Sequence, residues 1–306
     1  MDGQIKLTGP SGAVTAKIHP RGAGLRSLIV DGTQYIQQFA GDEPPFYAGL
    51  TLAPWPNRVR DGRWALAGAG GQLNQNELAL PNAIHGLVHS ARFEVERVRE
   101  DSVRLTTTIR PTRGWPFEIA LTVDFTLSTT GIRVDYGALN VGSRPAPFAI
   151  GAHPFFIVGS TPATELWLTA SARRVLLNDA QGIPSADVSV EDRPELDLRV
   201  RRSLGELRMA QCYTDFVTED GVVGCALTDA SGAGLRVWAD PAFRYWQFFT
   251  TDSFPTPAGP ATAVALEPMT APGDALNSGL GIRWINPDQH WAGAWGCERL
   301  RYGTPD

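Results

Sequence analysis

Two ionisable residues of this sequence lie in apolar surroundings, where a charge is costly unless it is paired or used in chemistry. Glu267 follows Ala-Val-Ala-Leu and precedes a proline, which predicts a carboxylate near the end of an apolar strand. His153 lies in the stretch Ile-Gly-Ala-His-Pro-Phe-Phe. A carboxylate and an imidazole can take up and deliver protons as a general acid–base pair. Each also has a structural interpretation, His153 as a satisfied core histidine and Glu267 as the ion-pair partner of an arginine such as Arg58.

Other polar residues lie beside proline, glycine or aromatic residues. Asn57 and Arg58 follow Ala-Pro-Trp-Pro, and prolines bias the preceding residues to extended backbone, which would aim the guanidinium group. His85 precedes a glycine, which allows close approach of the backbone. Asp215 lies among aromatic residues, as His153 does, and aromatic rings suit a sugar because its C–H faces stack on them. The alternative for Arg58 is an arginine on a solvated loop.

The sequence predicts neither a metal site nor a cofactor. His85 and His89 have a spacing that binds zinc on a helix, but a glycine follows His85 and no HExxH glutamate accompanies the pair. Glycine-rich phosphate loops, a GxGxxG after a strand and a GxSxG elbow are all missing from the sequence. Cys212, Cys225 and Cys297 are odd in number and lack CxxC spacing, which argues against a disulfide framework.

Composition excludes several classes of partner. The 306 residues contain 27 Lys and Arg against 32 Asp and Glu, a formal net charge of −5 at pH 7, with no basic run. This mild acidity argues against nucleic acids and anionic membranes as partners. The N-terminus shows no apolar run of signal-peptide length, and no stretch approaches the ~20 apolar residues of a membrane helix. We therefore expect a cytoplasmic protein with a small-molecule partner, as a monomer or a homodimer.

The elements that must position these residues are strands. Alternating apolar residues around a Ser-Thr-Thr-Gly turn predict a β-hairpin over residues 118–140, and residues 223–237 repeat the pattern. Residues 244–250 are bulky on both faces and are typical of a strand buried on both sides. Proline and glycine keep any helix in residues 271–280 short. The sequence predicts one all-β domain over residues 1–306, a large antiparallel β-sandwich.

The order of these motifs resembles the aldose 1-epimerase (galactose mutarotase) family. The resemblance extends over residues 45 to 280, and six motifs in the same order are specific where any single one is weak. It implies the galactose mutarotase-like β-sandwich, with neither cofactor nor metal. The motifs are Asn57-Arg58 in Trp-Pro-Asn-Arg-Val-Arg-Asp-Gly-Arg-Trp, Asn82-Ala-Ile-His85-Gly86, His153-Pro154-Phe155-Phe156, Tyr213-Thr-Asp215, Gln247 in Trp-Gln-Phe-Phe-Thr, and Leu266-Glu267 followed by Pro272, Asp274-Ala275 and Asn277.

The resemblance also implies roles for particular residues. Glu267 would be the general base and His153 the general acid. The substrate-binding residues, which would hold the sugar hydroxyl groups and ring oxygen, are Asn57, Arg58, His85, Asp215 and Gln247.

Three positions depart from the family pattern and indicate a divergent branch of the family. The sequence does not identify which sugar such a branch would use as its substrate. Leu87 stands where many members have a second glycine, Ile157 where an asparagine is usual, and Pro268 where a threonine is common.

The expected activity is interconversion of the α and β anomers of a hexose or related aldose, and two alternatives stay open. A glycoside hydrolase would use Asp215 and Glu267 as its carboxylate pair, with a separation that reports its stereochemistry. A non-catalytic carbohydrate-binding or sugar-sensing protein would not need an acid and a base on either side of C1. A phosphorylated or sulfonated sugar is also conceivable, although no arginines cluster beside the motifs beyond those within the motifs themselves.

Overall fold

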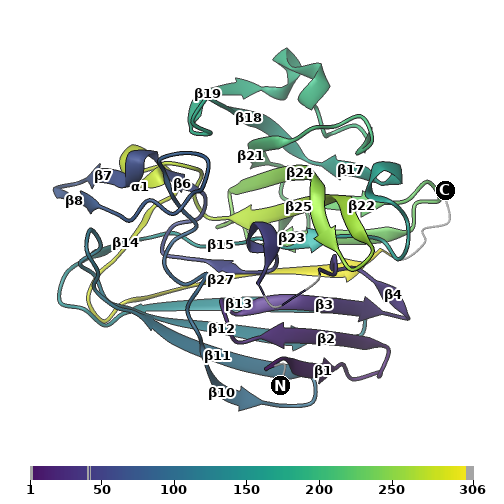
Figure 1. The fold of residues 1–306 in the computed structure, drawn as a ribbon, viewed down its shortest axis with the longest axis horizontal. Helices are drawn as coiled ribbons and strands as arrows, with labels where there is room; N and C mark the ends of the chain where they lie inside the picture. Colours follow the sequence, from purple (N-terminus) through teal and green to yellow (C-terminus); the bar gives the residue numbers. More distant parts are fainter. Residues whose placement is uncertain (1–2, 40, 42, 301–306) are drawn as a thin grey trace.

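Strands and turns form nearly all of the protein (Figure 1). The computed structural model describes residues 3–39, 41 and 43–300. None of the helices in that part of the chain is long and apolar enough to cross a membrane. The prediction of an all-β protein is confirmed. The helical segments are α1 (Ala275–Ser278) and the 3₁₀ turns η1 (Pro45–Tyr47), η2 (Arg60–Gly62), η3 (Ala163–Glu165), η4 (Val190–Asp192) and η5 (Pro194–Leu196).

The largest sheet has nine antiparallel strands. Every second residue of β12 is buried, because successive side chains of a strand point to opposite faces. The predicted hairpin over residues 118–140 is confirmed as β12 and β13, and that over residues 223–237 as β22 and β23. The order across the sheet is β10 (Glu94–Val98), β11 (Ser102–Ile109), β12 (Ile119–Leu127), β13 (Gly131–Asn140), β27 (His290–Arg299), β23 (Gly234–Ala239), β22 (Val223–Thr228), β17 (Trp167–Ala170) and β20 (Arg202–Ser203).

A second antiparallel sheet has eight strands, one of them off the main path. Its central hairpin joins β24 to β25, and β24 continues beyond the predicted strand over residues 244–250. This hairpin places Gln247 directly opposite Glu267. The order is β19 (Pro184–Ser189), β18 (Ala172–Asn178), β21 (Ala210–Phe216), β24 (Tyr245–Thr256), β25 (Gly259–Met269), β15 (Gly151–Ala152) and β5 (Thr51–Leu52), with β16 (Phe155–Phe156) also paired to β25.

Smaller sheets complete the architecture, and one hydrophobic core cluster joins all layers. This cluster contains Val14 of the N-terminal sheet, Val123 of the nine-stranded sheet and Leu266 of the eight-stranded sheet. Burial of such apolar surface is the main stabilising term of a sandwich of this kind. The N-terminal sheet is β1 (Ile5–Thr8), β2 (Val14–His19), β3 (Gly24–Val30) and β4 (Thr33–Gln34), and the two-stranded sheets pair β14 (Ala146–Phe148) with β26 (Arg283–Ile285), β6 (Arg58–Val59) with β9 (Ala83–Ile84), and β7 (Arg63–Leu66) with β8 (Ala69–Gln72).

Candidate active site

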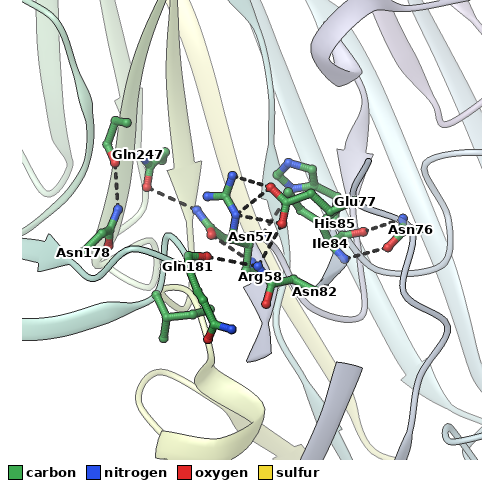
Figure 2. Close-up of polar contacts among 12 residues, drawn as sticks. Asn57, Arg58, Asn76, Glu77, Asn82, Ile84, His85, Asn178, Gln181 and Gln247 are labelled. Atoms are coloured by element: carbon green, nitrogen blue, oxygen red, sulfur yellow. Dashed lines mark hydrogen bonds and ion pairs between the residues drawn. The ribbon is translucent and has the colours of Figure 1, made fainter. Parts of the chain in front are cut away.

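A cavity of about 450 Å³ lies where β24 and β25 face the segments around η1, β6 and β9. Figure 2 shows the polar contacts in this region, with Asn57, Arg58 and Glu77 at its centre. Phe46, Tyr47, Ala210 and Phe249 are among the apolar and aromatic residues of its lining. The structure brings to this cavity six of the seven residues that the sequence predicts for the site: Asn57, Arg58, His85, His153, Gln247 and Glu267.

Glu267 and His153 form a buried pair in the wall of the cavity. Glu267 shares a face of the sheet with Gln247, its cross-strand partner. His153 comes from the connection between β15 and β16, which both pair with β25. Its Nε2 atom lies 3.4 Å from Glu267 Oε1, and the two side chains expose 6% and 2% of their surface. Glu267 Oε2 is buried with no hydrogen-bond partner among the described residues, an arrangement that is costly in a purely structural group.

Burial shifts the pKa values of this pair in opposite directions, because it disfavours the charged form of each group. It raises the pKa of Glu267 well above 4.5, and the Arg58 cation opposes this shift. It lowers the pKa of His153 from 6.5 to about 3. The ordinary order of the two pKa values is therefore reversed, and the carboxyl group of Glu267 holds a proton more tightly than the imidazole of His153. Between these pKa values the pair holds one proton, which rests on the carboxyl group beside a neutral imidazole.

His85 and Asn57 occupy strained backbone beside the cavity. Their φ angles of 63° and 57° lie in the left-handed region, which costs non-glycine residues about 1–2 kcal/mol. The backbone N–H of Asn57 donates to His85 Nδ1, and its side-chain Nδ2 donates to Gln247 Oε1, both at 3.2 Å. Burial, reinforced by His153, holds the pKa of His85 well below 6.5. Because Nδ1 accepts a hydrogen bond, the neutral ring carries its proton on Nε2, which makes that atom a donor.

Arg58 is held in place by Glu77, a residue that sequence reasoning missed (Figure 2). Arg58 Nε and Nη2 donate to Glu77 Oε1 at 2.9 and 2.7 Å, and Nε also lies 3.1 Å from Oε2. Asn82 Nδ2 donates to Glu77 Oε2 at 2.9 Å, which fixes the carboxylate from its other side. Charge-assisted pairs of this bidentate kind are the stronger class of hydrogen bond. The guanidinium group therefore faces the cavity in a defined orientation with part of its donor set still free.

Aromatic rings form another part of the cavity wall. Phe46 and Tyr47 are consecutive residues with φ angles of 50° and 59°, a rare arrangement for bulky side chains. The ring centroid of Tyr47 lies 4.6 Å from that of His85, edge-on, and 6.4 Å from that of His153. Strained backbone of this kind concentrates at functional sites. The wall offers flat apolar surface next to the titratable pair.

Metal-ligand residues do not cluster in the part of the chain that the structure describes. No group of three or more His, Cys, Asp or Glu side chains in that part could hold a metal ion. His85 and His89 both contact the ring of Tyr47, with centroid separations of 4.6 and 5.2 Å.

Comparison with known families settles which family this is, because the aldose 1-epimerase family model matches residues 4–295. The chain belongs to the aldose 1-epimerase family. The uncharacterized protein YihR of Escherichia coli (strain K12) is 28% identical over 276 residues, which cover 89% of this chain and 86% of YihR. The aldose 1-epimerase resemblance of the sequence is therefore confirmed.

Solved structures related to aldose 1-epimerases share the fold with little sequence identity. The GalM/aldose epimerase homologue from C. elegans has a TM-score of 0.83 at 16% identity, covering 99% of this chain and 100% of that chain. The galactose 1-epimerase from Lactobacillus acidophilus NCFM has a TM-score of 0.78 at 17% identity, covering 97% and 94%. The predicted galactose mutarotase-like β-sandwich is confirmed.

Asp215 is the predicted site residue that the structure does not bring to the cavity, although the resemblance to aldose 1-epimerases implies a sugar-binding role for it. It is exposed and lines a separate hollow. Cys212 is opposite Gln247 and shares its face of the sheet, but Asp215 lies beyond Tyr213, the last residue of β21 that pairs with β24, and its φ angle of 55° interrupts the alternation of the strand. Ala210, from that face of β21, lines the cavity instead. We therefore leave Asp215 out of the site.

Proposed function

We propose that the protein is an aldose 1-epimerase that interconverts the α and β anomers of an aldose ring and needs no cofactor. The observation that carries this proposal is the pair of His153 and Glu267, whose Nε2 and Oε1 atoms lie 3.4 Å apart in the wall of the cavity. Membership of the aldose 1-epimerase family supports the same activity.

Anomer exchange needs two proton transfers and no change of oxidation state. A base takes the proton of the C1 hydroxyl group, the bond between C1 and the ring oxygen breaks, and an acid protonates that oxygen. In the resulting open-chain aldehyde, rotation about the C1–C2 bond presents the other face of the carbonyl group. The reverse transfers close the ring as the other anomer. Each positioned acid or base contributes about 10²–10⁴-fold in rate.

In the proposed assignment Glu267 is the base and His153 the acid. The resting pair holds its proton on Glu267, because burial raises the pKa of the carboxyl group and lowers that of the imidazole. A shift of this proton to His153, 3.4 Å away, gives the reacting form without any change in the proton count. Sugar hydroxyl groups favour this charged form by hydrogen bonding to it. Ring opening then returns the pair to its neutral form, and ring closure restores the charges.

The remaining groups of the cavity hold the sugar. His85 offers the Nε2–H of a neutral ring, and Arg58 offers the guanidinium donors that Glu77 leaves free. Phe46 and Tyr47 provide apolar surface for the C–H face of the ring. We assign binding of the hydroxyl groups and ring oxygen to Asn57, Arg58, His85 and Gln247.

The position of Asp215 disfavours the glycoside hydrolase that would use it with Glu267. The two carboxylates line different hollows, whereas a glycosidase needs both on either side of one bond. A sugar-binding protein without catalytic activity would gain nothing from a buried, incompletely bonded carboxyl group beside an imidazole.

Polarimetry of freshly dissolved α-anomers tests the proposed function. We expect the protein to accelerate the approach to the equilibrium rotation of at least one aldose and to leave glycosides intact. Binding in a calorimetric titration without acceleration for any aldose would show a sugar-binding protein, and release of a free sugar from a glycoside would show a hydrolase.

Replacing Arg58 with alanine should weaken sugar binding and lower kcat/KM together. A hydrogen bond from a charged donor is worth about 1.5–3 kcal/mol, so KM should rise about tenfold to a hundredfold. Arg104→Ala is the matched control, since Arg104 forms a similar bidentate pair with Asp124 outside the lining of the cavity. Equal KM values for the two variants would remove Arg58 from the sugar site.

Chelation should leave the activity unchanged. The two proton transfers use Glu267 and His153, and the proposed chemistry needs no Lewis acid. The measurement is the mutarotation rate before and after dialysis against EDTA. A loss of rate that zinc restores would contradict the proposed mechanism.

A further inference from the structure

Two hairpin turns of this protein are built alike. Asp179 to Ile183 joins β18 to β19, and Asp229 to Ala233 joins β22 to β23. In both, the aspartate N–H donates to the carbonyl of the fifth residue, at 2.9 and 2.8 Å, and the glycine N–H donates to the aspartate carbonyl at 3.0 Å. In both, the aspartate Oδ1 accepts from two backbone N–H groups of the turn. The glycines, Gly182 and Gly232, have φ angles of 72° and 87°.

The two turns differ in what their glycines touch. A Cβ atom on Gly182 would lie 3.0 Å from Cζ, Nε and Nη1 of Arg58, whereas one on Gly232 would meet nothing within 4 Å. The backbone of Gly182 is therefore packed against the guanidinium group of Arg58, which also pairs with Glu77. A side chain at this position would therefore require the guanidinium group of Arg58 to shift by a few tenths of an ångström.

Further contacts fix the first turn against the site (Figure 2). Asn82 Nδ2 donates to the Gln181 carbonyl at 3.0 Å and also to Glu77. Asn82 therefore links the turn to Glu77, and both of these contact Arg58. Arg60 Nη2 lies 2.6 Å from Asp179 Oδ2, and Arg60 also bonds the Gln181 side chain. Because Asn82 is fully buried, the link to the turn is shielded from water.

We infer that the turn Asp179–Gly182 is a positioning element of the sugar site, which fixes the Arg58 guanidinium before the sugar binds. This inference rests on the proposed function of the cavity. An arginine side chain loses much rotamer freedom when it is ordered, and a contact that orders it in the free protein removes that cost from binding. The turn therefore acts on sugar affinity, through Arg58, and leaves the proton transfers of Glu267 and His153 unaffected.

Gly182→Ala and Gly232→Ala form a matched pair that tests this inference. Both place alanine at a positive φ angle in the same kind of turn, so both should lower the melting temperature by a similar amount. We expect Gly182→Ala to raise KM about fivefold to tenfold with kcat within about twofold, and Gly232→Ala to change neither. Equal KM values for the two variants would overturn the inference.

An Arg58→Ala background separates positioning from a general structural effect. There the guanidinium group that the added methyl group would shift is gone, so Gly182→Ala should produce no further rise in KM, because its effect passes through Arg58. The same rise in both backgrounds would contradict the inference. Arg60→Ala removes a different contact of the turn, the ion pair with Asp179, and should also raise KM. Failure of the proposed function would look different, since the wild-type protein itself would then exchange no anomers.

Discussion

Replacing Glu267 with glutamine should reduce the rate of anomer exchange by about 10²–10⁴-fold, the contribution of one positioned base. Glutamine keeps the size of the side chain and its capacity for hydrogen bonds, but its amide cannot take the proton of the C1 hydroxyl group. The sugar should therefore still bind, because the groups assigned to hold it are unchanged. The measurements are polarimetry of a fresh α-anomer and a calorimetric titration with the same sugar.

Asp215→Asn is the informative control for this variant. It makes the same carboxylate-to-amide change at the position that the family resemblance implies for sugar binding but that the structure places outside the cavity. We expect this control to have the wild-type rate and affinity. If Glu267→Gln exchanges anomers at the wild-type rate, Glu267 is not the base, and a sugar-binding role gains support.

His153→Asn should also lower the rate by about 10²–10⁴-fold, because the ring oxygen then loses its proton donor. Asparagine retains polar contacts in the cavity but cannot hold a mobile proton. His290→Asn, at an exposed histidine, is the control and should leave the rate unchanged. A wild-type rate in His153→Asn would exclude this histidine as the acid.

The pH profile of the wild-type protein gives the same prediction a second readout. Protonation of His153 removes the free site that must accept the proton of Glu267, so the rate should fall as the pH drops toward about 3, the lowered pKa of the imidazole. Loss of the last proton from the pair should end activity as the pH rises through the raised pKa of Glu267. The active range therefore extends well below 6.5. A rate that falls with protonation near pH 6.5 would contradict the burial of His153 as the cause.

Much of the fold could be predicted because alternation in a strand is a local property of the sequence. The hairpin over residues 118–140 has an apolar residue at every second position facing the core, and the structure follows that pattern. Glu267 and His153 stood out for a similar reason, since a polar residue within an apolar run contradicts the local pattern. The short helix in residues 271–280 also has a local cause in its proline and glycines.

Contacts between distant segments could not be predicted in the same way. From the sequence, Arg58 was one possible ion-pair partner of Glu267. In the structure Arg58 pairs with Glu77, and Glu267 lies beside His153. Glu77 belongs to a polar stretch with no periodicity, so nothing local marks it as a site residue. The position of Asp215 depends on where the pairing of β21 with β24 ends and on the left-handed backbone at Asp215 itself, and nothing local in the sequence marks either.

Exchange NMR on an equilibrated aldose tests the central claim most directly, because it observes α and β anomers interconverting at equilibrium without any net reaction. With wild-type protein we predict exchange cross-peaks between the two C1–H signals of at least one aldose, at mixing times where buffer gives none, and no new product signals. The same sample with Glu267→Gln should lose these cross-peaks. The account is contradicted if a panel of aldoses shows no protein-dependent exchange, or if the Glu267→Gln protein exchanges the anomers as fast as the wild type.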